Sequence, residues 1–316
     1  MSTMWYVILG AVSVAYFVLG GLDQGVAMLL PALRGDDRRR EALNALGPMF
    51  LGNEVWVVGA AGVLIAAFPR LEGELFTAAY PAVVAAVLGL AALSAGVQLR
   101  GRARRRGGFD VLIPAAGLTL ATAWGLLFGV LLHGVPIGAD GHVHGLAPFA
   151  DPMVWLTAAA NVLLVLAHGA AYLHWKLGRP LRPGLPLLAG GVAALALGGW
   201  WLAAPAGIRN PVAGTVLALV AVAAVVVAGW VPRPGMAFAA TAVACALPVV
   251  AAASALFPGV LASTLDPGAT VTVDGAAAGA DTLRLLTLGA APLLPVLVAV
   301  QAACWWLFRR RTSPYW

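Results

Sequence analysis

Two carboxylates interrupt long apolar runs near the N-terminus: Asp23, in the stretch GGLDQG, and Glu54, in the stretch GNEVW. Asn53 and Trp56 place an amide and an indole N–H beside the second acid. A charge in the middle of a membrane helix costs about 2.5–3.5 kcal/mol on insertion scales, so each acid needs a partner, a proton or water. Such groups relay protons or ions, bind a ligand, or hold helices together as a structural polar contact. The residues alone leave these three interpretations open.

The composition indicates a membrane protein that crosses the bilayer many times. Of the 316 residues, 61% are hydrophobic and 10% are charged, and the mean hydropathy is +0.91. Soluble domains have about 25% charged residues. The apolar runs lack the strict alternation of barrel strands, and the bilayer core offers the backbone no other partners, so the spans are expected to be helices. The fold class is therefore all-α and polytopic.

About nine runs are long enough to span a bilayer, which takes about 20 apolar residues. Together they make the whole chain, 1–316, a single integral membrane domain, with eight helices arranged as two four-helix bundles and one extra helix. The predicted spans are 4–33, 46–68, 75–99, 110–133, 152–176, 185–204, 211–231, 235–257 and 281–308.

Most of the 19 lysines and arginines lie in the loops on one side of these spans. The positive-inside rule then places the N-terminus outside and the C-terminus in the cytoplasm, as an odd number of spans requires. The pI is near 10, but the basic residues form short clusters between spans. We therefore interpret them as setting the orientation of the helices in the membrane, and no nucleic-acid partner is expected. The clusters contain Arg34, Arg38, Arg39, Arg40, Arg100, Arg102, Arg104, Arg105, Arg106, Lys176, Arg179, Arg182, Arg233, Arg309, Arg310 and Arg311.

The two acids are expected at similar depth on neighbouring antiparallel helices. With a rise of 1.5 Å per residue, Asp23 and Glu54 lie roughly 12–15 Å from the cytoplasmic ends of their spans, where they could share one polar pocket. Gly21 and Gly25 flank Asp23 at a spacing that lets helices approach closely. We therefore expect Asp23 to face another helix.

Two histidines, His168 and His174, lie on the fifth predicted span. Haem ligation needs histidine or methionine held deep in a helical bundle. A lone intramembrane histidine is more often hydrogen-bonded and structural, and His174 is near the interface. We expect no cofactor and no metal to be bound directly by this chain.

Several short stretches, in this order, resemble subunit II of the cytochrome bd quinol oxidases. The first is GGLDQGVAML at 20–29, in place of the family's acid-Gly-Phe-Asp-x-Gly-Val-x-Met-Leu. Asn44, Gly47-Pro48 and FLGNEVW at 50–56 follow, where the family has Trp-Asp-Gly-Asn-Glu/Gln-Val-Trp. The remaining pieces are GVLIAAFP, HGVPIGADGHV, HGAAYLHWK, LFPGVLASTLDP and ACWWLFRRR.

The resemblance implies a nine-helix subunit in a bacterial cell membrane, paired with subunit I. That partner carries haem b, haem d and the quinol site, and the complex oxidises quinol and reduces dioxygen to water. Subunit II holds no catalytic haem; it stabilises the complex and, in some members, provides a proton path or holds a structural quinone. A small single-helix subunit is a further expected partner.

Four charged or titratable positions of the family pattern are replaced here, at Gly20, Leu51, Leu93 and Gln98. A proton path needs a chain of titratable groups or waters. The usual path of this subunit is therefore predicted to be lost. The alternative is a diverged relative outside the oxidase, acting as a membrane carrier or an assembly scaffold.

Overall fold

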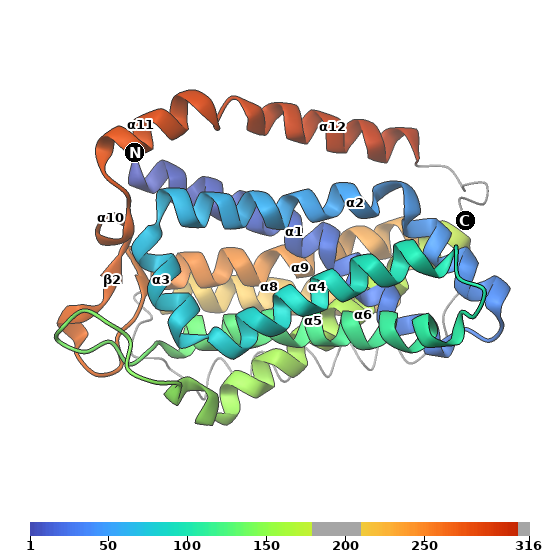
Figure 1. The fold of residues 1–316 in the computed structure, drawn as a ribbon, viewed down its shortest axis with the longest axis horizontal. Helices are drawn as coiled ribbons and strands as arrows, with labels where there is room; N and C mark the ends of the chain where they lie inside the picture. The colour runs from blue at the N-terminus through green and yellow to red at the C-terminus, as the bar shows by residue number, and fades with distance from the viewer. Residues whose placement is uncertain (179–209, 309–316) are drawn as a thin grey trace.

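Long apolar helices dominate the computed structural model, which describes residues 1–178 and 210–308 (Figure 1). Within those residues, seven helices are long and apolar enough to cross a membrane. The predicted spans between 4 and 176 and between 211 and 257 are confirmed, apart from the beginning of the third. The predicted span at 185–204 lies outside the described residues. The seven helices are α1 (Ser2–Leu29), continued by η1 (Leu30–Ala32), α2 (Asp36–Ala67), α4 (Tyr80–Arg100), α5 (Gly107–His133), α6 (Pro152–Leu177), α8 (Pro211–Trp230) and α9 (Pro234–Leu256).

The structure differs from the predicted spans in one boundary and one break, and a proline lies at each place. The span expected from 75 begins at Tyr80, because a separate short helix, α3 (Pro69–Ala78), precedes it and Pro81 occupies the first turn of α4. The span expected at 281–308 is broken into α11 (Ala280–Gly289) and α12 (Leu293–Leu307), bent by 40°. Pro292 lies at the break, where it has no N–H to continue the α11 ladder.

Helix α1 lies at the centre of the described helices and contacts α2, α5, α6 and α9. Helix α5 packs between α4 and α6, α8 packs against α9, and the α11–α12 arm runs along α2 (Figure 1). The division into two four-helix bundles stays a prediction, because it involves the span at 185–204.

Glycines bring α1 and α6 into backbone contact. A Cβ atom built on Gly25 would lie 1.9 Å from the carbonyl oxygen of Val165 and 2.8 Å from the amide nitrogen of Gly169. Gly21 is one turn away, and its Cβ would meet Val165 at 3.3 Å. Between membrane helices there is no hydrophobic driving force, because lipid is as apolar as the side chains. Small residues at the contact let the helices approach closely and gain van der Waals packing instead.

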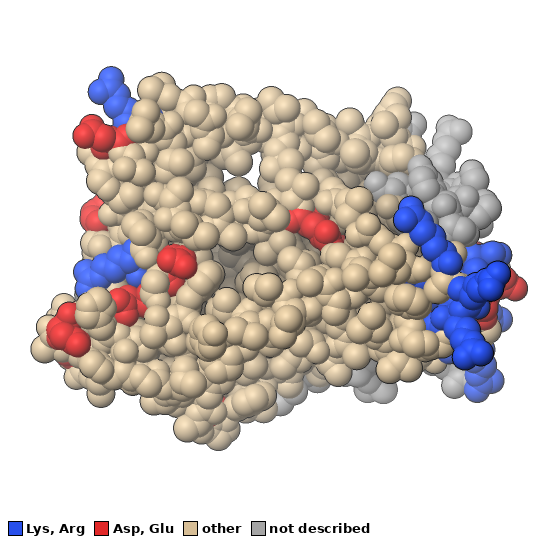
Figure 2. Space-filling view, in the orientation of Figure 1, with Lys and Arg blue, Asp and Glu red and all other residues tan. Residues whose placement is uncertain are grey.

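The two ends of the molecule differ in charge. Lysines and arginines gather at one end, where α1 passes into α2 and α4 into α5 (Figure 2). We call this the basic end. The opposite end is formed by the loops 134–151 and 258–280, which contain no lysine or arginine, and we call it the loop end.

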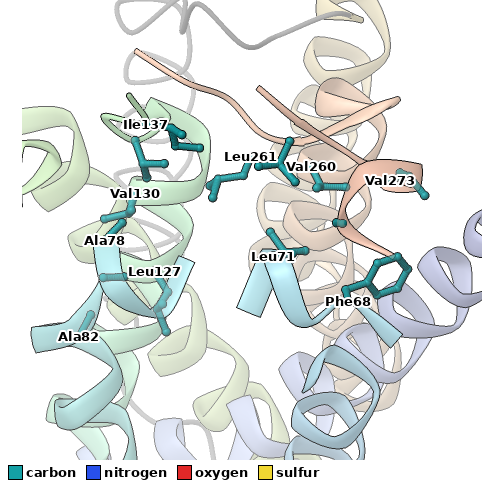
Figure 3. Packing of buried hydrophobic residues seen from close by; sticks show 14 of the residues in the cluster. Phe68, Leu71, Ala78, Ala82, Leu127, Val130, Ile137, Val260, Leu261 and Val273 are labelled. Carbon is teal, nitrogen blue, oxygen red and sulfur yellow. The ribbon is translucent and has the colours of Figure 1, made fainter. Parts of the chain in front are cut away.

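Apolar side chains bind the loops of the loop end to the helices. Strands β1 (Gly259–Leu261) and β2 (Val271–Thr272) pair antiparallel there, and the same loops contain η2 (Ala147–Ala150), η3 (Pro267–Ala269) and α10 (Val273–Ala276). Leu261 and Ile137 are both fully buried and pack with Val130 of α5 in one core cluster (Figure 3). The packed loops thus cover the ends of the helices at the loop end.

Candidate functional site

Asp23 of α1 is buried in the membrane-spanning part of the molecule, with 3% of its surface exposed. The side-chain amide of Asn53, from α2, donates to both carboxylate oxygens, at 3.2 Å to Oδ1 and 3.0 Å to Oδ2. Asn53 itself is fully buried. The carboxylate therefore faces a neighbouring helix and has two donated hydrogen bonds in place of water.

A third helix completes this contact through Gln301 of α12. Its Nε2 donates to Oδ1 of Asn53 at 3.1 Å, and its Oε1 accepts from the indole N–H of Trp56 at 3.3 Å. Asp23, Asn53, Gln301 and Trp56 thus form one hydrogen-bonded chain across α1, α2 and α12, which we call the Asp23 chain. The sequence analysis missed Gln301. A polar amide in the middle of the last apolar run could have indicated it.

Glu54 does not join the Asp23 chain through any hydrogen bond among the described residues. It follows Asn53 on α2, and the hydroxyl of Ser94 on α4 donates to its Oε1. The side chain is partly buried. Among the described residues the two acids thus have different hydrogen-bond partners, and their sharing of one polar pocket stays a prediction.

The four replaced family positions fall into different surroundings. A Cβ atom on Gly20 would lie 2.5 Å from the ring of Tyr16, so the aromatic ring fills the space that a larger side chain would need. Leu93 is buried in an apolar core, with 2% exposure. Leu51 is exposed on α2, and Gln98 is half-buried on α4.

Tyr16 is part of a second polar group on α1. Its hydroxyl accepts hydrogen bonds from Trp124 Nε1 at 2.9 Å and from Gln24 Nε2 at 3.3 Å. The ring also packs edge-on against Trp124. An aromatic cluster thus occupies the space beside Gly20, about one turn from Asp23.

At the basic end, Arg100 is 2% exposed and joins two aspartates. Its Nε lies 2.7 Å from Asp110 and its second terminal nitrogen lies 2.7 Å from Asp36. Arg39 and Arg106 add further ion pairs, to Asp110 and to Asp36. Desolvation raises the pKa of Asp36, but the hydrogen bonds from Arg100 and Arg106 outweigh it and hold this pKa below its ordinary value.

His168 is fully buried, and both of its ring nitrogens have partners. Nε2 lies 3.0 Å from the carbonyl oxygen of Val18, which can only accept, and Nδ1 lies 2.8 Å from the hydroxyl of Thr241. The ring stacks on Phe238. A haem iron would have to displace one of these partners, so the surroundings of His168 do not fit an axial ligand.

An apolar cavity of about 220 Å³ lies between α1, α2, α3, α5 and α9. Aromatic and aliphatic side chains line most of it, and polar side chains in the lining include Ser13, Tyr6 and Tyr16. The Tyr6 hydroxyl donates to the carbonyl oxygen of Ala253. Such a lining suits an apolar molecule with one or two polar atoms.

Comparison with known proteins gives consistent matches along nearly the entire chain. The family model described as cytochrome bd terminal oxidase subunit II matches residues 1–308. Cytochrome bd ubiquinol oxidase subunit 2 of Bacillus subtilis is 27% identical, over 99% of this chain and 97% of the relative. Cytochrome bd-I ubiquinol oxidase subunit 2 of Escherichia coli K12 is also 27% identical, over 98% and 95%.

The fold agrees with a solved structure of this kind. The structure of bd oxidase from Geobacillus thermodenitrificans superposes with a TM-score of 0.75, covering 97% of this chain and 98% of that chain at 16% identity. The family match over residues 1–308 and this fold lead to one assignment. The chain belongs to the cytochrome bd terminal oxidase subunit II family.

Proposed function

We propose that the chain is the haem-free subunit II of a quinol-oxidising terminal oxidase in a bacterial cytoplasmic membrane. It stabilises a subunit I that carries haem b and haem d and the quinol site, where quinol oxidation is coupled to the reduction of dioxygen to water. The full-length family match carries this proposal. The clustering of basic residues at one end supports an orientation with that end in the cytoplasm (Figure 2).

We propose further that the usual proton path of this subunit is lost. The Tyr16 ring fills the space beside Gly20, and Leu93 is surrounded by apolar side chains. The Asp23 chain is built from amides and an indole beyond its single carboxylate, and these groups do not titrate near neutral pH. Protons then reach the oxygen site through subunit I, and the role of Asp23 is to hold α1 to α2 and α12.

The apolar cavity is the proposed place for a quinone in this subunit. Its lining by rings and aliphatic side chains fits a quinone ring or an isoprenoid chain. A quinone there would add packing between α1, α2 and α9. A small single-helix subunit is a further proposed partner of the complex, on the family resemblance alone.

The test is to tag the chain in its native membrane, purify it gently, and record a reduced-minus-oxidised optical spectrum with mass spectrometry of co-purifying proteins and quinones. Haem b and haem d bands together with a co-purifying subunit I are expected. A colourless, solitary protein from cells that contain subunit I would overturn the proposal. The Asp23 chain does not support the alternative function of a membrane carrier, because Asp23 and Asn53 are almost fully buried.

A further inference from the structure

Ion pairs join the two loops at the basic end. Arg100, the last residue of α4, lies 2.7 Å from Asp36 at the beginning of α2 and 2.7 Å from Asp110 in the first turn of α5. Arg106 also pairs with Asp36, and Arg39 lies 2.7 Å from Asp110. These pairs fix the loop between α1 and α2 against the loop between α4 and α5. The arginines beside them are therefore brought together at this end of the molecule (Figure 2).

Arginines outnumber the acidic residues in these two loops. Residues 34–41 and 100–110 contain nine arginines and four acidic residues, a surplus of five positive charges. Asp37 contacts Arg40 within its own helix, so it adds no pair between the loops. Five arginines are exposed and have no ion pair among the residues that the structure describes. They are Arg34, Arg38, Arg102, Arg104 and Arg105, and we call them the arginine patch.

The rest of the sequence brings no acidic side chain to the arginine patch. Residues 179–209 and 309–316, which lie outside the described part of the chain, contain six arginines and no aspartate or glutamate. Asp23 and Glu54 lie within membrane spans. The other seven acidic residues lie toward the loop end, on α3, in the loops 134–151 and 258–280, and at the beginning of α11. The charge of the patch is therefore available to an anionic group from outside the chain.

Exposed apolar side chains lie directly beside the arginine patch. Leu99 is the last residue of α4 but one and is 48% exposed. Val111 and Leu112, early in α5, are 69% and 39% exposed. Because α4 and α5 are long and apolar enough to span the membrane, these side chains face lipid where the arginines reach the headgroup level. A soluble anion would match the arginines alone, whereas a phospholipid matches both surfaces.

We propose that the arginine patch binds the phosphate of an anionic phospholipid such as phosphatidylglycerol, with the acyl chains against Leu99, Val111 and Leu112. Guanidinium groups suit phosphate, because their planar fork of N–H donors matches the phosphate oxygens. The bound lipid holds both loops at the membrane surface. The inference goes beyond the proposed function and requires only that the chain lies in a membrane.

Photolabelling with a lipid probe tests the place and the charge of the ligand. The protein, in the complex in which it is purified, is placed in phosphatidylcholine nanodiscs with a small fraction of phosphatidylglycerol that has a diazirine on its acyl chain. Mass spectrometry then identifies the labelled peptides. Labelling within residues 99–112 is expected to exceed that from a phosphatidylcholine probe with the same diazirine by about 10-fold or more, since several arginines each add about a factor of five. Equal labelling by the two probes would overturn the inference.

A soluble competitor separates a lipid from a free phosphate. Excess glycerol phosphate has the charge of the headgroup but no acyl chain, so it is expected to leave the labelling of residues 99–112 unchanged. Complete competition by glycerol phosphate would show that a soluble anion suffices, and it would contradict the contact with Leu99, Val111 and Leu112.

Paired substitutions test the arginines themselves. Arg104→Gln/Arg105→Gln is expected to lower the labelling by phosphatidylglycerol about 10-fold or more. Arg104→Lys/Arg105→Lys keeps the charge and is expected to keep most of the labelling, and a loss equal to that of the glutamine pair would contradict recognition by charge. Arg70→Gln/Arg284→Gln is the matched control, because both arginines are exposed and lie outside the basic end. Equal losses in the two glutamine pairs would show a response to net charge alone and would overturn the assignment to the patch.

Discussion

The side-chain amide nitrogen of Asn53 donates to both oxygens of a single carboxylate, that of Asp23, at 3.2 and 3.0 Å. The same asparagine accepts from Gln301 at 3.1 Å. One small side chain on α2 therefore satisfies a buried acid on α1 and a buried amide on α12. Removing it leaves two polar groups without partners at once.

Replacement of Asn53 by leucine is expected to destabilise the protein by about 1–3 kcal/mol, because the unpaired groups keep their desolvation cost. Asp23→Asn is the matched control, since it removes the charge but keeps a side chain that can pair with Asn53. The measurement is the thermal unfolding midpoint of the purified protein in detergent. Equal losses for the two variants would show that the charge, and not the pairing, determines stability here.

The contact between α1 and α6 gives a second prediction. Gly25→Ala places a methyl group against the backbone of Val165 and Gly169 and is expected to cost about 1–3 kcal/mol through overpacking. Gly62→Ala on α2 is the control, because a Cβ there meets nothing within 4 Å. That control is expected to be neutral or to gain up to about 1 kcal/mol of helix propensity. Unfolding midpoints of the two variants, side by side, test the close approach directly.

The ion pairs at the basic end predict how stability depends on pH. The folded-state pKa of Asp36 lies below its ordinary value, so its stabilising effect is complete above the unfolded pKa of about 4 and is lost as the pH falls through the folded value. Asp36→Asn is expected to lower the unfolding midpoint at pH 7 and to flatten its decline toward pH 3. Asp37→Asn serves as the control, since that carboxylate is 93% exposed and contacts Arg40 in its own helix. Identical pH profiles for both variants would contradict the assignment.

The packing of Tyr16 against Gly20 predicts a compensation between two positions. Gly20→Asp alone restores an acid of the family pattern but forces it against the Tyr16 ring, so a clear loss of stability is expected. Tyr16→Ala opens that space, and the double variant Tyr16→Ala/Gly20→Asp is expected to be more stable than the sum of the single losses. A double-variant cycle on unfolding midpoints measures this coupling. Strict additivity would show that the ring does not occupy the place of the acid.

The helices themselves could be predicted from the sequence because twenty-residue apolar runs leave the backbone few alternatives in a bilayer. The break in the last span could not be placed, although Pro292 marked it, since proline is tolerated in many membrane helices. Asp23 and Asn53 were recognised as polar groups in an apolar run. Which helix each one faces depends on rotation about the helix axis, and hydropathy does not report that rotation.

Two features of the site needed the structure. Glu54 follows Asn53 directly, yet successive residues on a helix point about 100° apart, so the two engage different helices. Arg100 looked like one member of a basic loop, and its burial against Asp36 and Asp110 arises from residues 64 and 10 positions away in the sequence. Long-range pairs of this kind leave no local signal.

Helix α12 and the residue that follows it make polar contacts with two earlier helices, α2 and α6. Gln301 in the middle of α12 finds its partners on α2, and the ammonium of Lys176 on α6 donates to the carbonyl oxygen of Phe308, just after α12 ends. Helix α12 is synthesised after α2, so the amide of Gln301 finds its partners only if α2 is already in position. A chain in which α2 is misplaced therefore leaves the amide of Gln301 in the bilayer without its partners on that helix, at a cost in free energy.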